Sequence, residues 1–416
     1  MPSIARCCVA GSLALVLGSA ALAVAENWPA WRGPQGLGHA DAKGVPVSWS
    51  NKENVRWQVA LPAEGNATPI VWENRVYIAQ AQNEGKIRGL MCFNRENGEL
   101  LWSKEVAYEE PETTHGTNPY CSSSPVADGE RIFVWYGSAG FYAYTMDGEE
   151  LWNVDLGKFE HIWGNASSPV LYKDKVLLHA GPGENTFLVA LDQKTGKEIW
   201  RNSELTSGDN PRRGQEGSWS TPVLYEDQGR TLALLSVPGS LAAFDPETGK
   251  KVWWCDGLTR LVYTSPLVSD GVAVAMSGYG GAAIGVRTGG EGNVTETHRL
   301  WLHDKRNPQR VGSGVMVGKH LYILHDTGVA WCMNAETGEK LWESRLGGAW
   351  SSMVYADGKL YVVGSGGNAY VIEPDPSECK VLATNRLGET TRASLAFADN
   401  QIFIRTYKNL YCIEAK

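Results

Sequence analysis

From residue 190 to residue 200 the chain reads A-L-D-Q-K-T-G-K-E-I-W, an eleven-residue stretch that recurs along the sequence. Further copies are A-F-D-P-E-T-G-K-K-V-W at 243–253, C-M-N-A-E-T-G-E-K-L-W at 332–342, C-F-N-R-E-N-G-E-L-L-W at 92–102 and a shorter one at 143–152. Alternating apolar residues predict a strand, the Asp or Asn of most copies can cap the turn, and Gly supplies the positive φ that closes it. Repeated hairpins whose second strand ends in Trp indicate a repeat protein.

A Ser/Thr-Pro step opens the early repeat units. It occurs at Thr68-Pro69, Ser124-Pro125, Ser168-Pro169, Thr221-Pro222 and Ser265-Pro266. A second strand follows a charged or Gly turn, as in R-V-Y-I at 75–78, and the hairpin supplies strands three and four. Four short strands per unit are typical of a propeller blade. No stretch shows a 3.6-residue period, so we expect almost no helix.

The spacing of the terminal tryptophans gives the number of blades. They recur once per unit, at Trp57, Trp102, Trp152, Trp200, Trp253, Trp301 and Trp342. In the next unit Val381 takes the Trp position, and three strands then remain. The isolated strand at Trp57 supplies the missing fourth strand by pairing around Tyr411, which removes both open sheet edges. We therefore expect an all-β, eight-bladed β-propeller of four-stranded antiparallel blades, closed by its N-terminal strand, with seven blades as the alternative.

The chain divides into three parts. In residues 1–25 an apolar run follows Arg6 and ends in A-V-A, which predicts a cleaved signal peptide, with an uncleaved anchor as the alternative. Residues 26–50 contain three Trp among Pro and Gly, and predict an extended arm across a larger body. Residues 51–416 form a single propeller domain. We therefore expect a periplasmic or secreted protein without a membrane span after cleavage.

Charge and cysteine content narrow the class further. The net charge is −8 and no basic cluster exceeds two residues, which argues against a nucleic-acid partner. Three of the eight cysteines share one repeat position, where other copies carry Ala, Gly or Val: Cys92, Cys332 and Cys412. Cys behaves there as a small hydrophobe, so we interpret these as structural thiols. The sequence leaves open the disulfide state of Cys121, Cys255 and Cys379.

The A-x-D-x-x-T-G-x-x-x-W pattern resembles the tryptophan-docking motif of the PQQ-like β-propeller repeat family. Three copies match well and two match partly, and the resemblance extends from about Val55 to the end of the chain. The fifth unit departs from the pattern, because a Gly-rich insertion precedes Trp301. In that family the Trp packs between adjacent blades. The resemblance implies the fold and says little about activity.

Two branches of this family imply different functions. Quinoprotein dehydrogenases hold pyrroloquinoline quinone and Ca²⁺ in the propeller centre, typically beneath an adjacent Cys-Cys disulfide. Here the adjacent pair Cys7-Cys8 lies in the predicted signal, and no acidic calcium site aligns. The chain is closest in type to BamB-like outer-membrane assembly propellers, which are binding scaffolds. We therefore expect an exported, non-catalytic, monomeric scaffold without a cofactor, whose partner is a cell-envelope protein or a small ligand.

The alternatives are a quinoprotein-type oxidoreductase using pyrroloquinoline quinone, and a small-molecule or glycan binder using the central funnel. No G-x-S-x-G or C-x-x-C motif occurs, and we expect no catalytic, cofactor-binding or metal-ligating residue.

Aromatic residues before the first strand of several units predict a binding surface, since this loop lies near the channel of a propeller. The predicted surface consists of Tyr120, Trp163, Trp219, Tyr263 and Trp350, with Arg392 in the last blade. Polar neighbours are His115, Asn118, His161, Asn165, Gln215, Glu216 and Arg260. Aromatic faces with a few polar groups suit a flat ligand, a sugar or a peptide side chain. The alternative is that these rings only pack one blade against the next.

Overall fold

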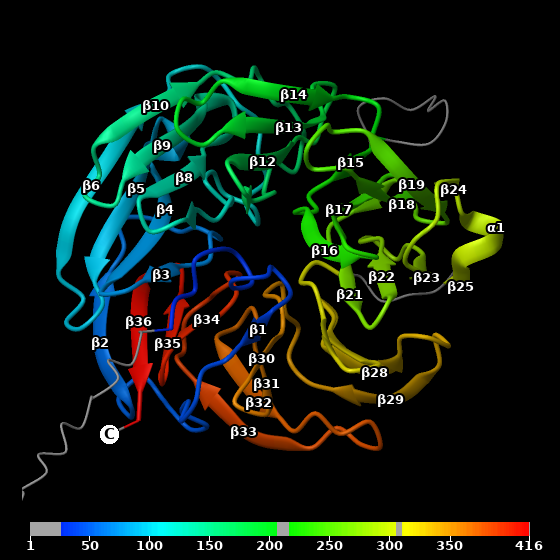
Figure 1. Ribbon diagram of the computed structural model, residues 1–416. Coiled ribbons are helices and arrows are strands. Elements are labelled where there is room, and N and C mark those ends of the chain that lie inside the picture. The colour runs from blue at the N-terminus through cyan, green and yellow to red at the C-terminus, as the bar shows by residue number, and fades with distance from the viewer. Residues whose placement is uncertain (1–25, 206–215, 305–309, 416) are drawn as a thin grey trace, which may run out of the picture.

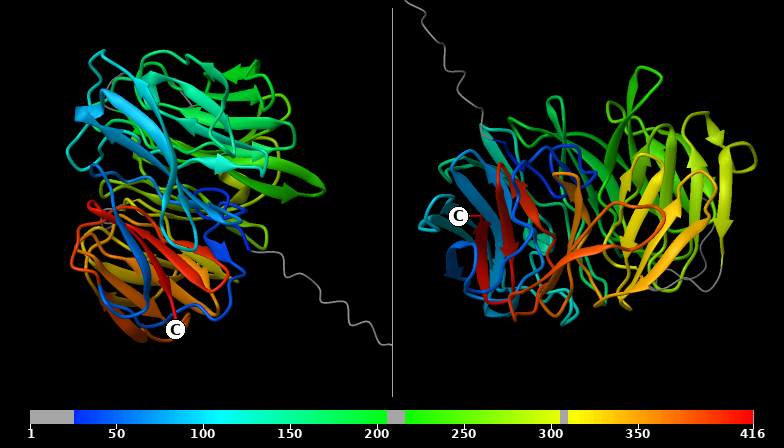
Figure 2. Two further views of the ribbon diagram at one scale, coloured as in Figure 1. Left: turned by 90° about the vertical axis from the view of Figure 1, so that its left-hand side faces the viewer. Right: turned by 90° about the horizontal axis from the view of Figure 1, so that it is seen from below.

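The computed structural model describes residues 26–205, 216–304 and 310–415. Eight antiparallel sheets surround a central channel, and the first strand of each lies nearest the channel (Figure 1). Seen from the edge in Figure 2, the strands run from one face of the ring to the other. The prediction of an all-β, eight-bladed propeller is therefore confirmed. The predicted signal peptide and Gln215 lie outside the described residues.

Each of blades 1 to 4 has four antiparallel strands. Blade 1 contains β3 (Ile70–Trp72), β4 (Arg75–Gln82), β5 (Ile87–Asn94) and β6 (Leu100–Ala107). Blade 2 contains β7 (Val126–Ala127), β8 (Arg131–Trp135), β9 (Phe141–Thr145) and β10 (Glu150–Val154). Blade 3 contains β11 (Val170–Tyr172), β12 (Lys175–Ala180), β13 (Phe187–Asp192) and β14 (Glu198–Asn202). Blade 4 contains β16 (Val223–Asp227), β17 (Arg230–Val237), β18 (Ser240–Phe244) and β19 (Lys251–Asp256).

Blades 5 to 8 repeat this arrangement. Blade 5 contains β21 (Leu267–Ser269), β22 (Val272–Met276), β23 (Ala283–Arg287) and β25 (Arg299–His303). Blade 6 contains β26 (Val315–Val317), β27 (His320–Leu324), β28 (Val329–Asn334) and β29 (Lys340–Arg345). Blade 7 contains β30 (Val354–Ala356), β31 (Lys359–Val363), β32 (Asn368–Ile372) and β33 (Val381–Arg386). Blade 8 contains β34 (Ala396–Ala398), β35 (Gln401–Arg405), β36 (Asn409–Glu414) and the N-terminal β2 (Val55–Ala60).

Few elements lie outside the blades. β15 (Gly217–Ser218) and β20 (Leu261–Val262) form a separate parallel pair. The helices of the described ranges are η1 (Asn83–Gly85), η2 (Gly137–Ala139) and α1 (Thr295–His298), as the lack of a helical period predicted. None of these helices has the length and apolar character needed to cross a membrane.

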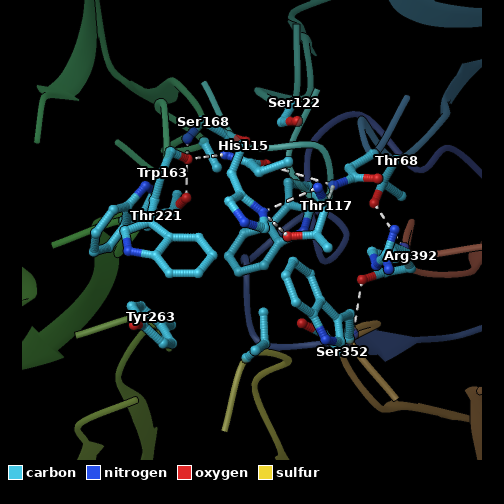
Figure 3. A pocket seen from close by; sticks show the side chains of 18 of the residues that line it. Thr68, His115, Thr117, Ser122, Trp163, Ser168, Thr221, Tyr263, Ser352 and Arg392 are labelled. Carbon is cyan, nitrogen blue, oxygen red and sulfur yellow. Dashed lines mark hydrogen bonds between the residues drawn. The ribbon is translucent and has the colours of Figure 1, made fainter. Parts of the chain in front are cut away.

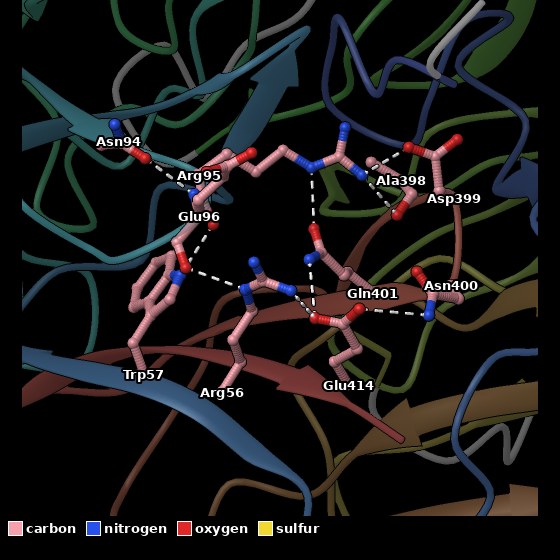
Figure 4. A network of polar contacts seen from close by, with 10 residues as sticks. All are labelled: Arg56, Trp57, Asn94, Arg95, Glu96, Ala398, Asp399, Asn400, Gln401 and Glu414. Carbon is pink, nitrogen blue, oxygen red and sulfur yellow. Dashed lines mark hydrogen bonds and ion pairs between the residues drawn. The ribbon is translucent and has the colours of Figure 1, made fainter. Parts of the chain in front are cut away.

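The ring closes where the two ends of the propeller domain meet. β2 pairs antiparallel with β36, and Trp57 lies opposite Cys412. Arg95, in the turn of blade 1, donates to the backbone oxygen of Ala398 (2.9 Å) and to the Asp399 carboxylate (2.7 Å) of blade 8 (Figure 4). The Trp57 indole N–H donates to the Arg95 oxygen at 2.7 Å. The predicted closure is confirmed, and polar contacts across the seam reinforce it.

The strand register explains why one repeat position carries small residues. In most blades that position lies directly opposite the terminal Trp, as Cys92 lies opposite Trp102 and Cys332 opposite Trp342. Each of these cysteines therefore packs beside a large ring. The cysteines within the described ranges are free thiols, and burial raises the pKa of Cys92, Cys332 and Cys412 to about 12.

The assignment of Val381 to the Trp position was wrong by two residues. Val371 of the small-residue position lies opposite Ala383, whereas Val381 lies opposite Ile372. The connection between β32 and β33 contains the run P-D-P-S and is longer than the connection with the D-x-x-T-G turn in the other blades. The longer connection moves the residue opposite Val371 further along the second strand.

Most terminal tryptophans contact the hairpin turn of the following blade. Their indole N–H groups donate to backbone oxygens there, in the pairs Trp57–Arg95, Trp152–Gln193, Trp200–Pro246, Trp301–Ala335 and Trp342–Asp375. The turn glycine explains how the ring fits. Gly249 has φ +72°, and a Cβ there would lie 2.3 Å from the Trp200 ring. Only Gly provides both the backbone conformation and the space.

The insertion in blade 5 returns to blade 4. It contains β24 (Gly292–Asn293) and α1, and β24 adds to the outer edge of β19 as a parallel fifth strand. The insertion replaces the short turn that other blades offer to a preceding Trp. Trp253 of β19 is fully buried, and its indole N–H donates to the Tyr225 hydroxyl of its own blade.

The segment 26–50 crosses the ring from blades 1 and 2 to blades 6 and 7. Trp28 exchanges two backbone hydrogen bonds with Val71 of β3, each 2.9 Å long. β1 (His39–Ala40) then adds to β30 as a parallel strand, and the side chain of Asn385 accepts from the Trp49 amide. In Figure 1 this segment, in dark blue, passes from the region of β3 to β1. It therefore passes over the end of the channel.

Candidate functional site: an aromatic funnel

A cavity of about 290 Å³ lies at the centre of the ring, and we call it the funnel. Its wall is formed by the loops that enter the first strands, by the loop that carries Tyr279 and by Trp31 of the arm. The aromatic residues that line it are Trp31, Trp163, Trp219, Tyr263, Tyr279 and Trp350. Tyr279 is 69% exposed and His115 is exposed, so the funnel opens to solvent at their side.

Most of the predicted surface residues lie together in this cavity. Trp163, Trp219, Tyr263, Trp350 and Arg392 all line the funnel, and Figure 3 shows Trp163, Tyr263 and Arg392 around the same space. Whether they bind a ligand remains a prediction. Among the predicted polar neighbours His115 and Asn118 also line the funnel, whereas His161, Asn165, Glu216 and Arg260 do not.

Tyr120 does not line the funnel. Its ring covers the Arg88 guanidinium at 4.8 Å, and its hydroxyl donates to the backbone oxygen of Glu112 at 2.6 Å. The ring also lies against Gly85, where a Cβ would come within 2.3 Å. Tyr120 therefore serves as cover for a buried cation, which the position of an aromatic residue in the sequence could not reveal.

A buried ion pair holds the loop between blades 1 and 2. Arg88 and Glu112 lie 3.0 Å apart, and their side chains are 2% and 3% exposed. Glu112 also accepts a hydrogen bond from Asn165 of the next loop (3.3 Å). Beyond this contact His115 lies over Trp163 with ring centroids 4.2 Å apart. The ion pair thus fixes the position of one side of the funnel wall.

Trp219 stands between two other rings. It meets His161 and Tyr263 edge-on, with centroid distances of 5.0 and 5.1 Å. Its indole N–H donates to the Gly164 oxygen at 2.8 Å, so the ring both lines the funnel and joins the loops of blades 3 and 4. Burial lowers the pKa of His161 and raises that of Tyr263 to about 12. Both groups are therefore neutral at pH 7.

Trp350 and Arg392 form the opposite side. The Arg392 guanidinium lies 4.8 Å from the centre of the Trp350 ring and also donates to the Tyr407 hydroxyl. The Trp350 indole N–H donates to the Asp326 carboxylate at 2.6 Å. Arg392 contacts two aromatic rings, Trp350 and Tyr407, and lines the cavity. A stacked guanidinium presents its N–H groups in a plane, which suits recognition of a carboxylate.

A closed ring of hydrogen bonds forms the throat of the funnel. In every blade one Ser or Thr before the first strand accepts a hydrogen bond from the amide of the equivalent residue in the preceding blade, at 2.8–3.1 Å. The eight residues are Thr68, Ser124, Ser168, Thr221, Ser265, Ser313, Ser352 and Ser394. The Ser/Thr-Pro step showed five of them. The other three lack the Pro, and only the structure reveals them.

Sequence reasoning missed two further rings. Trp31 comes from the arm and lines both the funnel and a second cavity on the side of β11, β16 and β21. It therefore separates the funnel from that cavity. Tyr279 comes from the loop between β22 and β23 in blade 5. Trp31 belongs to a conspicuous W-P-A-W-R run, but nothing in that run indicates the channel.

The fold family raises the question of a quinone held by Ca²⁺. Ca²⁺ is bound by oxygen ligands, chiefly carboxylates. Among the residues described as lining the funnel there is no Asp or Glu, and no cluster of His, Cys, Asp or Glu suited to a metal occurs in the described ranges. The described donor set of the funnel does not fit that group.

Comparisons with known proteins agree with this fold. The sequence model of the family described as outer membrane protein assembly factor BamB matches residues 40–120, 184–313, 293–378 and 326–416. BamB from Moraxella catarrhalis superposes with a TM-score of 0.61 at 15% identity, over 87% of this chain and 97% of that chain. Quinohemoprotein alcohol dehydrogenase from Comamonas testosteroni superposes with a TM-score of 0.67 at 11% identity, over 94% and 81%. At such identities the likeness shows the fold alone.

A curated relative matches a smaller part of the chain. Tetrathionate hydrolase from Acidithiobacillus ferrooxidans is 23% identical over 171 residues, which span 40% of this chain and only 30% of that protein. The match to the family model, in contrast, extends over more than half of the chain. The chain belongs to the PQQ-repeat propeller family of the outer membrane protein assembly factor BamB.

Proposed function

We propose that this protein is an exported binding propeller without catalysis of its own, which holds a flat group in the funnel. The group belongs to a cell-envelope protein or to a small ligand. The observation that carries the proposal is the convergence of six aromatic rings, from the loops of blades 3, 4, 5 and 7 and from the arm, on one open cavity. The rings come from segments far apart in sequence.

The dimensions of the funnel support a small guest. Ligand pockets usually measure about 300–1,000 Å³ and combine apolar walls with a few polar groups. The funnel lies at the lower end of this range with its volume of about 290 Å³. It suits one side chain or a small ring system. Rings such as Trp163 and Trp350 offer large rigid faces at little entropic cost, which favours binding.

The family relation supports a role at the cell envelope. BamB is named as an outer membrane assembly factor, and the sequence of residues 1–25 predicts export. This protein would then act by contact with a partner. The quinoprotein alternative predicts a quinone absorbance and dye-linked alcohol oxidation after incubation with pyrroloquinoline quinone and Ca²⁺, and we expect neither.

The test compares partner capture by variants of the mature protein. Immobilised residues 26–416 are incubated with an envelope extract of the source organism, and the retained proteins are quantified. Tyr279→Ala and Trp350→Leu should each reduce the specific partner about tenfold or more, as for rings at the centre of an interface. Tyr142→Ala is the control, because Tyr142 is half-buried on β9 and does not line the funnel. Equal capture by all three variants would contradict the proposal.

A further inference from the structure

The throat of the funnel carries hydroxyl hydrogens that no described group accepts. Each hydroxyl of the eight-residue ring accepts an amide N–H from its neighbour, and none donates in any hydrogen bond within the described ranges. A hydroxyl has one hydrogen to donate in addition to its lone pairs. Five of these residues line the funnel: Thr68, Ser168, Thr221, Ser352 and Ser394.

The hydrogen-bond ring makes these hydroxyls better donors. An amide that donates to a hydroxyl oxygen polarises the hydroxyl and favours donation of its hydrogen. The ring is closed, because Ser394 in the last blade donates its amide to the Thr68 hydroxyl of the first at 3.1 Å. In Figure 3, Thr68, Ser168, Thr221 and Ser352 surround the same space as Arg392. The throat therefore presents several donors to one point.

Arginines without a carboxylate partner surround this throat. Within the described ranges Arg32, Arg310 and Arg405 are about 1% exposed and form no ion pair. Arg405 donates to the backbone oxygen of Ala67, next to Thr68, and Arg32 to that of Gly314, next to Ser313. Arg310 precedes Val311, which lines the funnel.

These guanidinium groups remain charged at neutral pH. Burial lowers the pKa of Arg32 and Arg310 to about 9 and that of Arg405 to about 10. All three values lie well above 7. In a medium of low dielectric constant their field reaches farther than it would in water. The positive surroundings of the throat contrast with the net charge of −8 for the chain.

Three described carboxylates in loops around the funnel have other partners. Glu112 pairs with Arg88, and Asp326 accepts from Trp350. Burial alone would raise the pKa of Glu389, but hydrogen bonds from Thr406, Asn409 and Tyr411 hold it below its ordinary value. No described Asp or Glu lines the funnel, so no described carboxylate compensates the charge of the arginines within the cavity itself.

We propose that the funnel selects an organic anion, whose carboxylate enters the hydroxyl-lined throat while its flat apolar body lies between the aromatic rings. This inference rests on the proposed binding function and adds the class of ligand. Arg392 acts at the wall as the accessible cation, because it lines the cavity and contacts no carboxylate in the described ranges. The three buried arginines act through their field. The specificity follows from charge, and the rings alone would accept a neutral guest equally well.

The test uses two ligands of nearly the same shape, 2-naphthoate and 2-naphthamide, in calorimetric titrations of the mature protein. Hydrogen bonds to a charged group are roughly twice as strong as those between neutral groups. We therefore expect the naphthoate to bind about tenfold more tightly, since tenfold corresponds to 1.4 kcal/mol. Added salt should weaken only the naphthoate.

Variants of the funnel residues test which side chains cause the preference for naphthoate over naphthamide. Arg392→Gln and Thr221→Val should each reduce the naphthoate advantage to less than about threefold, which is the loss of roughly half of the tenfold difference in free energy. Thr221→Val keeps the shape of the side chain and removes the hydroxyl, together with the hydrogen bond that it accepts from the Ser168 amide, so its melting curve is measured beside its binding. It also decides the matter if Arg392→Gln fails to fold. The control is Arg287→Gln, an exposed arginine of β23 outside the funnel, which should retain the full advantage.

The outcomes separate the two proposals. Equal binding of both ligands would overturn the anion site and leave the binding function standing. If neither ligand bound, the anion site would be overturned, and the binding function would be decided by the partner capture described above. A naphthoate advantage that survived Arg392→Gln and Thr221→Val would place the anion elsewhere and overturn the inference as well.

Discussion

Gly249 closes the hairpin turn of blade 4 and lies against Trp200 of blade 3, so Gly249→Ala measures the contact between neighbouring blades. The new Cβ would lie 2.3 Å and 2.7 Å from two carbons of the Trp200 ring. Real Cβ atoms do not approach so closely, and the ring or the turn must move. A movement of the ring also weakens the bond from the Trp200 indole N–H to the Pro246 oxygen, now 3.1 Å long.

The expected loss in the free energy of unfolding of Gly249→Ala has two parts. A non-Gly residue at φ +72° costs about 1–2 kcal/mol for its left-handed conformation. Overpacking against the ring adds about 1–3 kcal/mol. The control Gly229→Ala separates the two, because Gly229 lies in another turn of the same blade with φ +85°, and a Cβ there would have no other atom within 4 Å. It should lose only the first part.

Urea unfolding, monitored by circular dichroism, measures the loss of stability in each of the two variants. We expect Gly249→Ala to lose about 1–3 kcal/mol more than Gly229→Ala, at an unchanged dependence on urea. In a Trp200→Leu background the difference should shrink, since the two sites would no longer be coupled. Equal losses in the wild-type background would refute the view that the turn glycine exists to admit the tryptophan.

Further expectations concern closure, pH and the funnel wall. Deletion of residues 51–60 removes β2, exposes the edge of β36 and should cause aggregation or a lower melting temperature; an unchanged melting curve would contradict the closure. Burial lowers the pKa of His179 to about 4 from 6.5, so the unfolded chain binds the proton first, and stability falls as the pH drops from 7 towards 4. The loss at pH 4.5 should be about 2.5 kcal/mol, and His179→Gln should remove it in urea titrations at both pH values. Glu112→Gln leaves Arg88 buried and unpaired, which should cost about 3–5 kcal/mol; a loss below 1 kcal/mol in the same assay would show that the pair is not buried.

The repeat motif revealed most of the fold because its residues act locally. Asp or Asn, Gly and Trp at fixed spacing specify a hairpin without reference to the rest of the chain, and counting them gave eight blades. The errors arose where a connection changes length, as at Val381, or where an insertion returns to another blade, as β24 does. Such contacts depend on tertiary structure, which the spacing of residues does not encode.

The site was less predictable for the same reason. The aromatic residues before the first strands indicated the funnel, and five of the six named residues line it. Trp31 was missed because a segment far away in sequence brings it there. Tyr120 was misplaced because the cation that it covers, Arg88, lies on β5, far from this loop in sequence. The hydroxyl ring was visible only in the five blades where Pro follows.

The propeller is held together at two radii, so its stability does not depend on the aromatic loops of the funnel alone. Near the rim most terminal tryptophans contact the next blade through fixed partners in the hairpin turns. At the throat, backbone amides and hydroxyls join all eight blades in a closed ring. The loops that carry Trp163 and Trp350 therefore need not bind the blades together alone. Their rings can vary in offset and face the cavity, while the tryptophan contacts and the hydroxyl ring preserve the fold. In the anion site proposed above, the hydroxyl ring would serve both the fold and the binding.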